Sequence, residues 1–246
     1  SFYFMNKIKS KKNKNYFAGF GDPVLTKNNE KIVLNSKVSK NLFSRGGLAD
    51  IERIKELPEL PKTSYELTEI SKNFINKDLF LRRDFNETNI KSEELSKYSV
   101  ISFATHGIIA NEIDGVFEPG LITSPPSKAG KIDDGVLTSS EIKKLNLNAE
   151  LIILSACNTA ASDGSANSEG LSGLASSFFY AGAKSLLVSH WYVEDETTVD
   201  LMKNTFNNLK ETNNMSQSLR NIKISMINEN NTAHPIFWAP FVLIGG

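Results

Sequence analysis

The sequence predicts an α/β protein, a three-layer αβα sandwich built on a mostly parallel sheet. Two observations predict this fold class. Short runs of apolar residues recur at 100–104, 151–154, 186–188 and 241–244, and such runs are typical of parallel strands that are covered on both faces. Between the runs lie segments with apolar residues at helical spacing, which predict helices that cover the sheet.

The first half of the chain opens with an expected strand over residues 16–20, which ends in a turn rich in glycine and proline. Residues 27–60 are polar and are expected to form a long excursion. A helix is expected to begin at Thr63, because Thr63 and Glu66 have the spacing of a capping box. A second helix is expected over residues 89–97, ahead of the first long apolar run.

The second half alternates expected strands and helices. Residues 111–137 contain several prolines and glycines and are expected to form a loop with a hairpin near Leu121 and Ile122. Thr138 and Glu141 have a second capping-box spacing, so a helix is expected to start there. The remaining helical stripes are Leu171, Leu174, Phe178 and Ala181; Val199, Met202, Phe206 and Leu209; and Leu219, Ile222 and Met226.

Charge and composition exclude several classes of function. Lysine plus arginine equal aspartate plus glutamate, at 28 each, so no nucleic-acid partner is expected. No apolar run approaches the roughly 20 residues of a membrane span, so no membrane association is expected. Residues 1–15 are polar and basic and are expected to be a solvated segment, followed by one domain over residues 16–246. A single cysteine suits a reducing compartment, and a cytoplasmic location is expected.

Metal and cofactor chemistry also lack a signature in the sequence. One cysteine and three scattered histidines give no metal-ligand spacing. The chain contains neither a GxxxxGK[ST] phosphate loop nor a dinucleotide fingerprint. We therefore expect no metal and no cofactor.

Three polar segments follow predicted strands at the carboxyl edge of the sheet, where sites form in open parallel sheets. They read "ATHG" at 104–107, "SACNT" at 155–159 and "SHWYVEDET" at 189–197. If their strands are neighbours, His106 and Cys157 face each other and supply the base and thiol of covalent catalysis. Gly107 leaves the backbone open, so its amide could reach a developing oxyanion.

The same residues also have ordinary structural interpretations. A lone cysteine at the end of an apolar run is often a buried core residue, and a histidine after a strand is often structural. His190 is expected to support its loop, and His234 lies before Pro235 in a turn. The pairing of His106 with Cys157 at two strand ends favours the catalytic interpretation.

The chain resembles the CHAT domain, a caspase-like peptidase domain commonly found downstream of TPR repeats in bacterial proteins. The resemblance rests on "GFGDPVL", "LPELPKTSYELTEI", "FATHG", "DDGVLTSSEI", "LIILSACNTA", "EGLSGLASSFFYAGAKSLLVSHW" and "HPIFWAPFVLIGG", which occur in that order. It covers roughly residues 16–246. Because the chain begins at Ser1 and the family domain begins further upstream, we expect a C-terminal piece of a longer protein with an upstream TPR region.

The resemblance implies roles for individual residues. The family pattern makes His106 and Cys157 the catalytic dyad, and caspase-like enzymes imply an oxyanion hole at the amides of Gly107 and Cys157. Ser155, two residues before the nucleophile, stands where caspases and metacaspases carry a residue that selects the substrate. Asp195 lies in a segment similar to a separase loop in which an aspartate reads a basic residue, and its alternative role is a helix N-cap.

We interpret the sequence as that of a cysteine endopeptidase that cleaves a protein or peptide substrate through an acyl-enzyme. One alternative is a catalytically dormant caspase-like interaction module. Another is a small-molecule hydrolase on a similar sheet, but the chain has no G-x-S-x-G elbow, since Ser168-Glu169-Gly170 does not form one.

Overall fold

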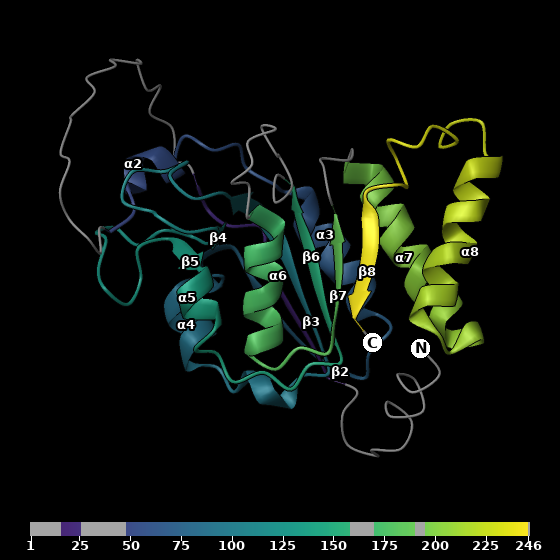
Figure 1. Ribbon diagram of the computed structural model, residues 1–246, viewed down its shortest axis with the longest axis horizontal. Helices are drawn as coiled ribbons and strands as arrows, with labels where there is room; N and C mark the ends of the chain where they lie inside the picture. The colour runs from purple at the N-terminus through teal and green to yellow at the C-terminus, as the bar shows by residue number, and fades with distance from the viewer. Residues whose placement is uncertain (1–15, 26–47, 158–169, 190–194, 246) are drawn as a thin grey trace.

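The computed structural model describes residues 16–25, 48–157, 170–189 and 195–245, and Figure 1 shows their arrangement. One sheet crosses this part of the molecule, with the strand order β2-β1-β3-β6-β7-β8. All neighbours in this order pair in parallel except β8, which is antiparallel to β7. Its strands are β1 (Tyr16–Gly21), β2 (Asn76–Leu81), β3 (Val100–Ile108), β6 (Leu151–Cys157), β7 (Ser185–Ser189) and β8 (Phe241–Gly245).

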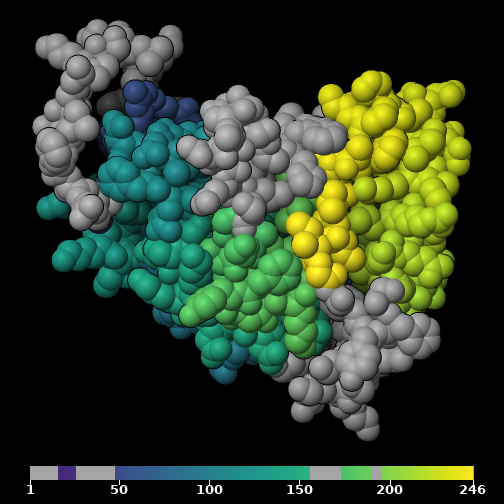
Figure 2. All heavy atoms as spheres, in the orientation of Figure 1, coloured from purple at the N-terminus to yellow at the C-terminus, as the bar shows by residue number. Residues whose placement is uncertain are grey.

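Helices cover both faces of this sheet, which confirms the predicted α/β sandwich. Figure 1 shows α6 in front of the sheet, and Figure 2 shows α7 and α8 forming one side of the molecule. Residues of α4, α5 and α6 share a core cluster with one face of the strands, and residues of α3, α7 and α8 share a second cluster with the other face. These helices are α3 (Lys62–Ser71), α4 (Glu87–Ser92), α5 (Ser139–Ile142), α6 (Gly170–Tyr180), α7 (Asp195–Thr212) and α8 (Met215–Asn228).

The central strands are buried on both faces because successive side chains enter different clusters. On β3, Ile101 and Phe103 belong to the cluster with α4, α5 and α6, whereas Val100 and Ala104 belong to the cluster with α3, α7 and α8. This alternation explains why the run over residues 100–104 is apolar except for the buried Ser102. The next polar residues, Thr105 and His106, lie toward the carboxyl end of the strand.

A short antiparallel extension continues the sheet beyond β3. The strands β4 (Gly120–Ile122) and β5 (Val136–Thr138) pair with each other, and β4 pairs with Gly107 and Ile108. The predicted hairpin near Leu121 and Ile122 is thus confirmed. Residues of β4 and β5 enclose a third apolar cluster with α2 (Ile51–Ile54). The extension fixes the backbone immediately after His106.

The predicted capping box at Thr63 is wrong, whereas the one at Thr138 is confirmed. Helix α3 begins at Lys62, and its N-cap, Pro61, makes no side-chain capping bond. Thr63 lies inside the helix and donates its hydroxyl to the carbonyl of Leu60. Glu66 is buried, and its Oε1 accepts the hydroxyl of Ser155 on β6 at 2.6 Å. Thr138 and Glu141 form both bonds of a capping box at the start of α5.

Two further differences concern the first half of the chain. The helix expected over residues 89–97 is two elements, α4 and the 3-10 helix η2 (Leu95–Lys97), because Glu93 has an extended backbone. Strand β2 has no counterpart among the predicted strands, since it lies at the edge of the sheet, where its residues are only partly buried. A second 3-10 helix, η1 (Arg82–Asp84), follows it directly.

Candidate functional site

The two candidate catalytic residues lie beside each other on neighbouring strands. Strands β3 and β6 pair in parallel, and their register places His106 opposite Cys157. Because neighbouring strands are about 4.8 Å apart, the backbones of the two residues are adjacent. This register places both residues toward the carboxyl ends of neighbouring strands, as the sequence argument required, and their roles as a catalytic dyad stay a prediction. The side chain of Cys157 lies outside the described part of the structure.

His106 is half-buried and has a defined hydrogen-bond partner. Its Nε2 atom lies 2.7 Å from the carbonyl oxygen of Pro58. A carbonyl only accepts, so Nε2 carries the proton and donates it. In the neutral imidazole Nδ1 is then the unprotonated nitrogen that remains to accept a proton. The contact thus selects the tautomer that leaves Nδ1 basic.

Pro58 was not among the predicted site residues, although the motif "LPELPKTSYELTEI" contains it. It lies in the connection that leads from β1 into α3, a helix on one face of the sheet. The strand order shows that β2 lies on one side of β1 and β3 lies on the other. The order in which strands are added to the sheet therefore reverses between β1 and β3. Such a switch point opens a crevice at the carboxyl ends of the strands. The Pro58 carbonyl contacts His106 from this connection.

The backbone around His106 is fixed by β4. Gly107 lies opposite Leu121 in the antiparallel pair of β3 with β4, and it is buried. The hydroxyl of Thr105, which is also buried, donates to the carbonyl of Ile122 at 2.7 Å. These contacts hold the strand residues on both sides of His106. The use of the Gly107 amide as an oxyanion donor stays a prediction.

Ser155 is buried and bonded to a carboxyl group within the protein. Its hydroxyl donates to Oε1 of Glu66 at 2.6 Å, and the two residues are 8% and 3% exposed. Glu66 belongs to α3, so this bond ties the middle of that helix to β6 just before Cys157. No sequence pattern predicts a carboxyl group beside Ser155, because the spacing of Glu66 from Thr63 is that of a capping residue. A role of Ser155 in substrate selection stays a prediction.

The remaining predicted site residues are placed as follows. Asp195 is the first residue of α7, and its side chain lies outside the described part of the structure. The next residue, Glu196, forms an ion pair with Lys62 at the start of α3, at 3.2 Å. His190 lies outside the described residues. His234 is exposed, and its Nδ1 accepts the amide of Ile236 at 3.2 Å, a contact within its own turn.

Among the described residues, no group of three or more histidine, cysteine, aspartate or glutamate side chains is arranged to hold a metal ion.

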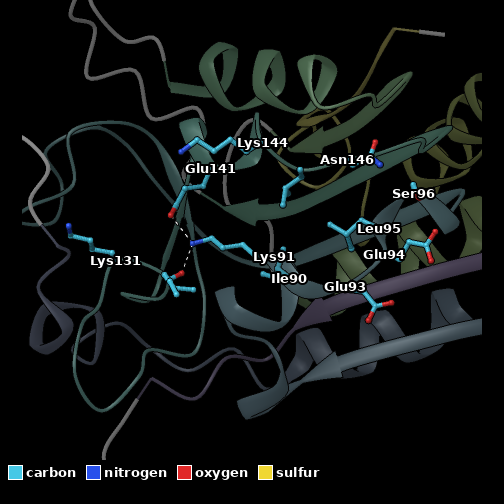
Figure 3. Close-up of a pocket in the computed structure, with 12 residues that line it drawn as sticks. Ile90, Lys91, Glu93, Glu94, Leu95, Ser96, Lys131, Glu141, Lys144 and Asn146 are labelled. Carbon is cyan, nitrogen blue, oxygen red and sulfur yellow. Dashed lines mark hydrogen bonds and ion pairs between the residues drawn. The ribbon is translucent and has the colours of Figure 1, made fainter.

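A pocket of about 520 Å³ lies along α4, η2 and α5 (Figure 3). Leu95 and Asn146, which line it, precede β3 and β6, so the pocket lies toward the edge opposite His106. Figure 3 shows Lys91 pointing to Glu141, and the two form an ion pair at 2.7 Å.

The comparisons with known proteins place the whole chain in one family. The family model described as the CHAT domain matches residues 7–246. No curated protein matches the chain. Within the described part of the chain, none of the helices has the length and apolar character needed to cross a membrane.

Proposed function

Because this chain belongs to the CHAT domain family, a caspase-like family related to peptidases, we propose that it is a cysteine endopeptidase with Cys157 as nucleophile and His106 as acid–base group. The observation that carries the proposal is the register of β3 and β6, which pairs these two residues at the carboxyl edge of the sheet. A thiol and an imidazole in adjacent positions are the minimum required for covalent acyl transfer.

The proposed reaction proceeds through an acyl-enzyme. The thiolate of Cys157 adds to the peptide carbonyl carbon, and the carbonyl oxygen becomes an oxyanion that the amides of Gly107 and Cys157 stabilise. His106, protonated on both nitrogens, donates a proton to the leaving amine as the C–N bond breaks. A water molecule then adds to the thioester, with His106 as general base, and the thiol leaves. The net change is hydrolysis of one peptide bond.

The Pro58 carbonyl supports His106 in this scheme. Its acceptor oxygen at 2.7 Å keeps the proton on Nε2, so the proton gained and lost during catalysis resides on Nδ1. It also accepts a stronger, charge-assisted bond when the imidazole is protonated. A carboxylate as third catalytic member is not required for this orientation.

The substrate preference follows from the residues assigned near the nucleophile. We propose that the substrate is a protein or peptide with a basic residue before the scissile bond, with Asp195 contacting that side chain. Ser155 is small and uncharged, which removes any reason to expect cleavage after aspartate. Its bond to Glu66 keeps its hydroxyl directed at the protein.

The test uses peptide acyloxymethyl ketones whose first residue is basic, acidic or aliphatic. A catalytic thiolate displaces the carboxylate of the probe and leaves a thioether, which intact mass detects. Since Cys157 is the only cysteine of the chain, each adduct can be assigned to it. We expect one adduct, fastest with the basic probe and absent in Cys157→Ala and strongly slowed in His106→Ala. Failure of every probe on the full chain would contradict the enzyme and favour a caspase-like interaction module.

A further inference from the structure

An ion-pair cluster lies directly beside the segment that supplies the Pro58 carbonyl. Nη1 of Arg82 contacts Oε2 of Glu59 at 2.9 Å and Oδ1 of Asp22 at 3.0 Å. Glu59 is the residue after Pro58, Asp22 follows the end of β1, and Arg82 follows the end of β2. We name Asp22, Glu59 and Arg82 the clamp. Two strand ends and the β1–α3 connection are thus joined at one guanidinium group.

The clamp is anchored in the backbone at each of its residues. The other oxygen of Glu59, Oε1, accepts the amide of Leu25 at 3.3 Å, and the amide of Arg82 donates to the carbonyl of Asp22 at 3.1 Å. The carbonyl of Arg82 accepts the hydroxyl of Ser124, which comes from the loop after β4, at 2.6 Å. The ends of β1 and β2 and the loop after β4 are therefore all connected to the clamp.

Two residues of the clamp have an unusual backbone. Asp22 and Arg82 have φ values of 52° and 56°, in the left-handed region. This region is sterically unfavourable for a side chain such as that of arginine, and residues held there concentrate at functional sites. Both residues directly follow the paired strands β1 and β2, and at this position Arg82 contacts the carboxyl groups of Asp22 and Glu59.

Burial of its carboxylates separates the clamp from an ordinary surface ion pair. The side chains of Asp22 and Glu59 are 9% and 28% exposed and that of Arg82 is 50% exposed, whereas the Arg53–Glu56 pair in the same connection is 60% and 40% exposed. Exposed pairs contribute little. A buried carboxylate that shares one guanidinium with a second carboxylate constrains the position of both. The clamp is thus suited to fixing the segment, and Arg53–Glu56 is a natural control.

We propose that Glu59 and Arg82 are positioning residues that hold the Pro58 carbonyl against Nε2 of His106. The inference rests on the proposed function for its consequence in catalysis, but the positioning of the imidazole is a property of the folded chain. Without the clamp the connection between Leu57 and Pro61 moves relative to β3, and the bond at Nε2 loosens. His106 then loses its orientation toward the end of β6.

The test compares Glu59→Gln and Arg82→Gln with the matched controls Glu56→Gln and Arg83→Gln in the full chain. Arg83 is adjacent to Arg82, exposed and outside the clamp. The first readout is the rate of Cys157 labelling by the basic ketone probe. We expect a decrease of about 10- to 100-fold in both clamp variants, as small misplacements of catalytic groups cause, and unchanged rates in both controls. Arg82→Lys, which keeps the charge, is expected to restore most of the rate.

The second readout is the imidazole N–H resonance of His106 in ¹H–¹⁵N spectra, assigned with His106→Ala. We expect a signal protected from exchange in the wild type and in both controls, and its loss in Glu59→Gln and Arg82→Gln. A double variant is expected to be no slower than the slower single variant, because both act through one contact. Thermal unfolding is measured for each variant to recognise any that is misfolded. If one clamp variant is misfolded, the conclusion rests on the other clamp variant.

The outcomes separate the two proposals. An unchanged resonance and an unchanged labelling rate in a folded Arg82→Gln would overturn the positioning role while leaving the dyad intact. If no probe labels the wild type, the proposed endopeptidase function is rejected, and the His106 resonance alone tests the positioning role. Loss of the resonance in the clamp variants then supports the positioning role, and its persistence rejects that role.

Discussion

The carbonyl oxygen of Pro58 lies 2.7 Å from Nε2 of His106, although the two residues are 48 positions apart in the chain. The contact joins the β1–α3 connection to the carboxyl end of β3. It gives the imidazole a fixed donor nitrogen and leaves the other nitrogen available. The histidine of the proposed dyad is therefore held by a backbone acceptor and does not need a neighbouring carboxylate.

Replacing His106 by alanine is expected to lower the rate of Cys157 acylation by about 10²- to 10⁴-fold, the usual contribution of a general acid–base group. The side chain is only half-buried at the sheet edge, so the unfolding midpoint should change little. Stopped-flow labelling and thermal unfolding measure the two effects. His234→Ala removes an exposed histidine and serves as the control. Equal rates in the two variants would exclude an acid–base role for His106.

Replacing Ser155 by alanine is expected to lower the free energy of unfolding by about 1–3 kcal/mol, the cost of removing a hydrogen bond from a buried carboxyl group. Ser155 and Glu66 are both buried at their 2.6 Å contact. Ser225 makes the same kind of bond to Glu229 at 3.1 Å, but on the surface. Ser225→Ala should therefore cost less than about 0.5 kcal/mol. Urea unfolding compares the two, and equal costs would mean that the buried bond contributes nothing beyond an exposed one.

The same Ser155 variant also tests substrate selection. If the hydroxyl serves only to bind Glu66, the preference among basic, acidic and aliphatic ketone probes stays as in the wild type. A change in the order of the three labelling rates would instead assign Ser155 to the substrate pocket. The comparison uses rate ratios within one variant, so a loss of folded protein does not affect it.

Replacing Gly21 by alanine is expected to destabilise the fold by about 1–3 kcal/mol, the range for overpacking a close contact. A Cβ atom at Gly21 would lie 2.6 Å from Leu67 of α3 and 2.8 Å from the carbonyl oxygen of Ala104 on β3. The backbone oxygen has little freedom to move. At Gly130 an added Cβ would meet its nearest atom at 3.7 Å, so Gly130→Ala is the control. Similar unfolding free energies for both variants would show that α3 can shift away from the strand.

The sheet was predictable because its strands are buried on both faces. Residues 151–154 on β6 and 186–188 on β7 are apolar at successive positions, and residues 100–104 on β3 are apolar except for Ser102, so the runs are visible without a structure. Edge strands such as β2 lack this signal, since only part of each residue is covered. The neighbouring placement of His106 and Cys157 followed from the same pattern, because both residues lie near the carboxyl ends of paired central strands.

The contacts around the site were not predictable in the same way. The spacing of Thr63 and Glu66 fits a capping box, but local spacing carries no information on a partner 89 positions away, and Glu66 binds Ser155 instead. The Pro58 carbonyl is a backbone group, which every residue possesses, so no residue type marks it. The clamp includes a left-handed backbone at Asp22 and Arg82, and the residue types alone do not predict this conformation.

The buried carboxyl of Glu87 should make the stability of the protein depend on pH. Its Oε1 accepts the amides of Asp134 and Gly135 at 2.8 and 2.9 Å, and Lys91 contacts Oε2 at 2.5 Å. Desolvation outweighs these contacts and raises the pKa of Glu87 to about 8. Since the pKa is higher in the folded chain than in the unfolded one, this group stabilises the fold fully at low pH, and the contribution is lost as the pH rises through about 8.

Glu87→Gln removes this titration while keeping a similar shape, so the free energy of unfolding of the variant should stay nearly constant where that of the wild type falls. Urea unfolding at several values between about pH 6 and about pH 9.5 measures the difference, which should change in favour of the variant as the pH rises. The other ionisable groups are common to both proteins and cancel in the comparison. Parallel curves would mean that the amides and Lys91 keep Glu87 charged throughout.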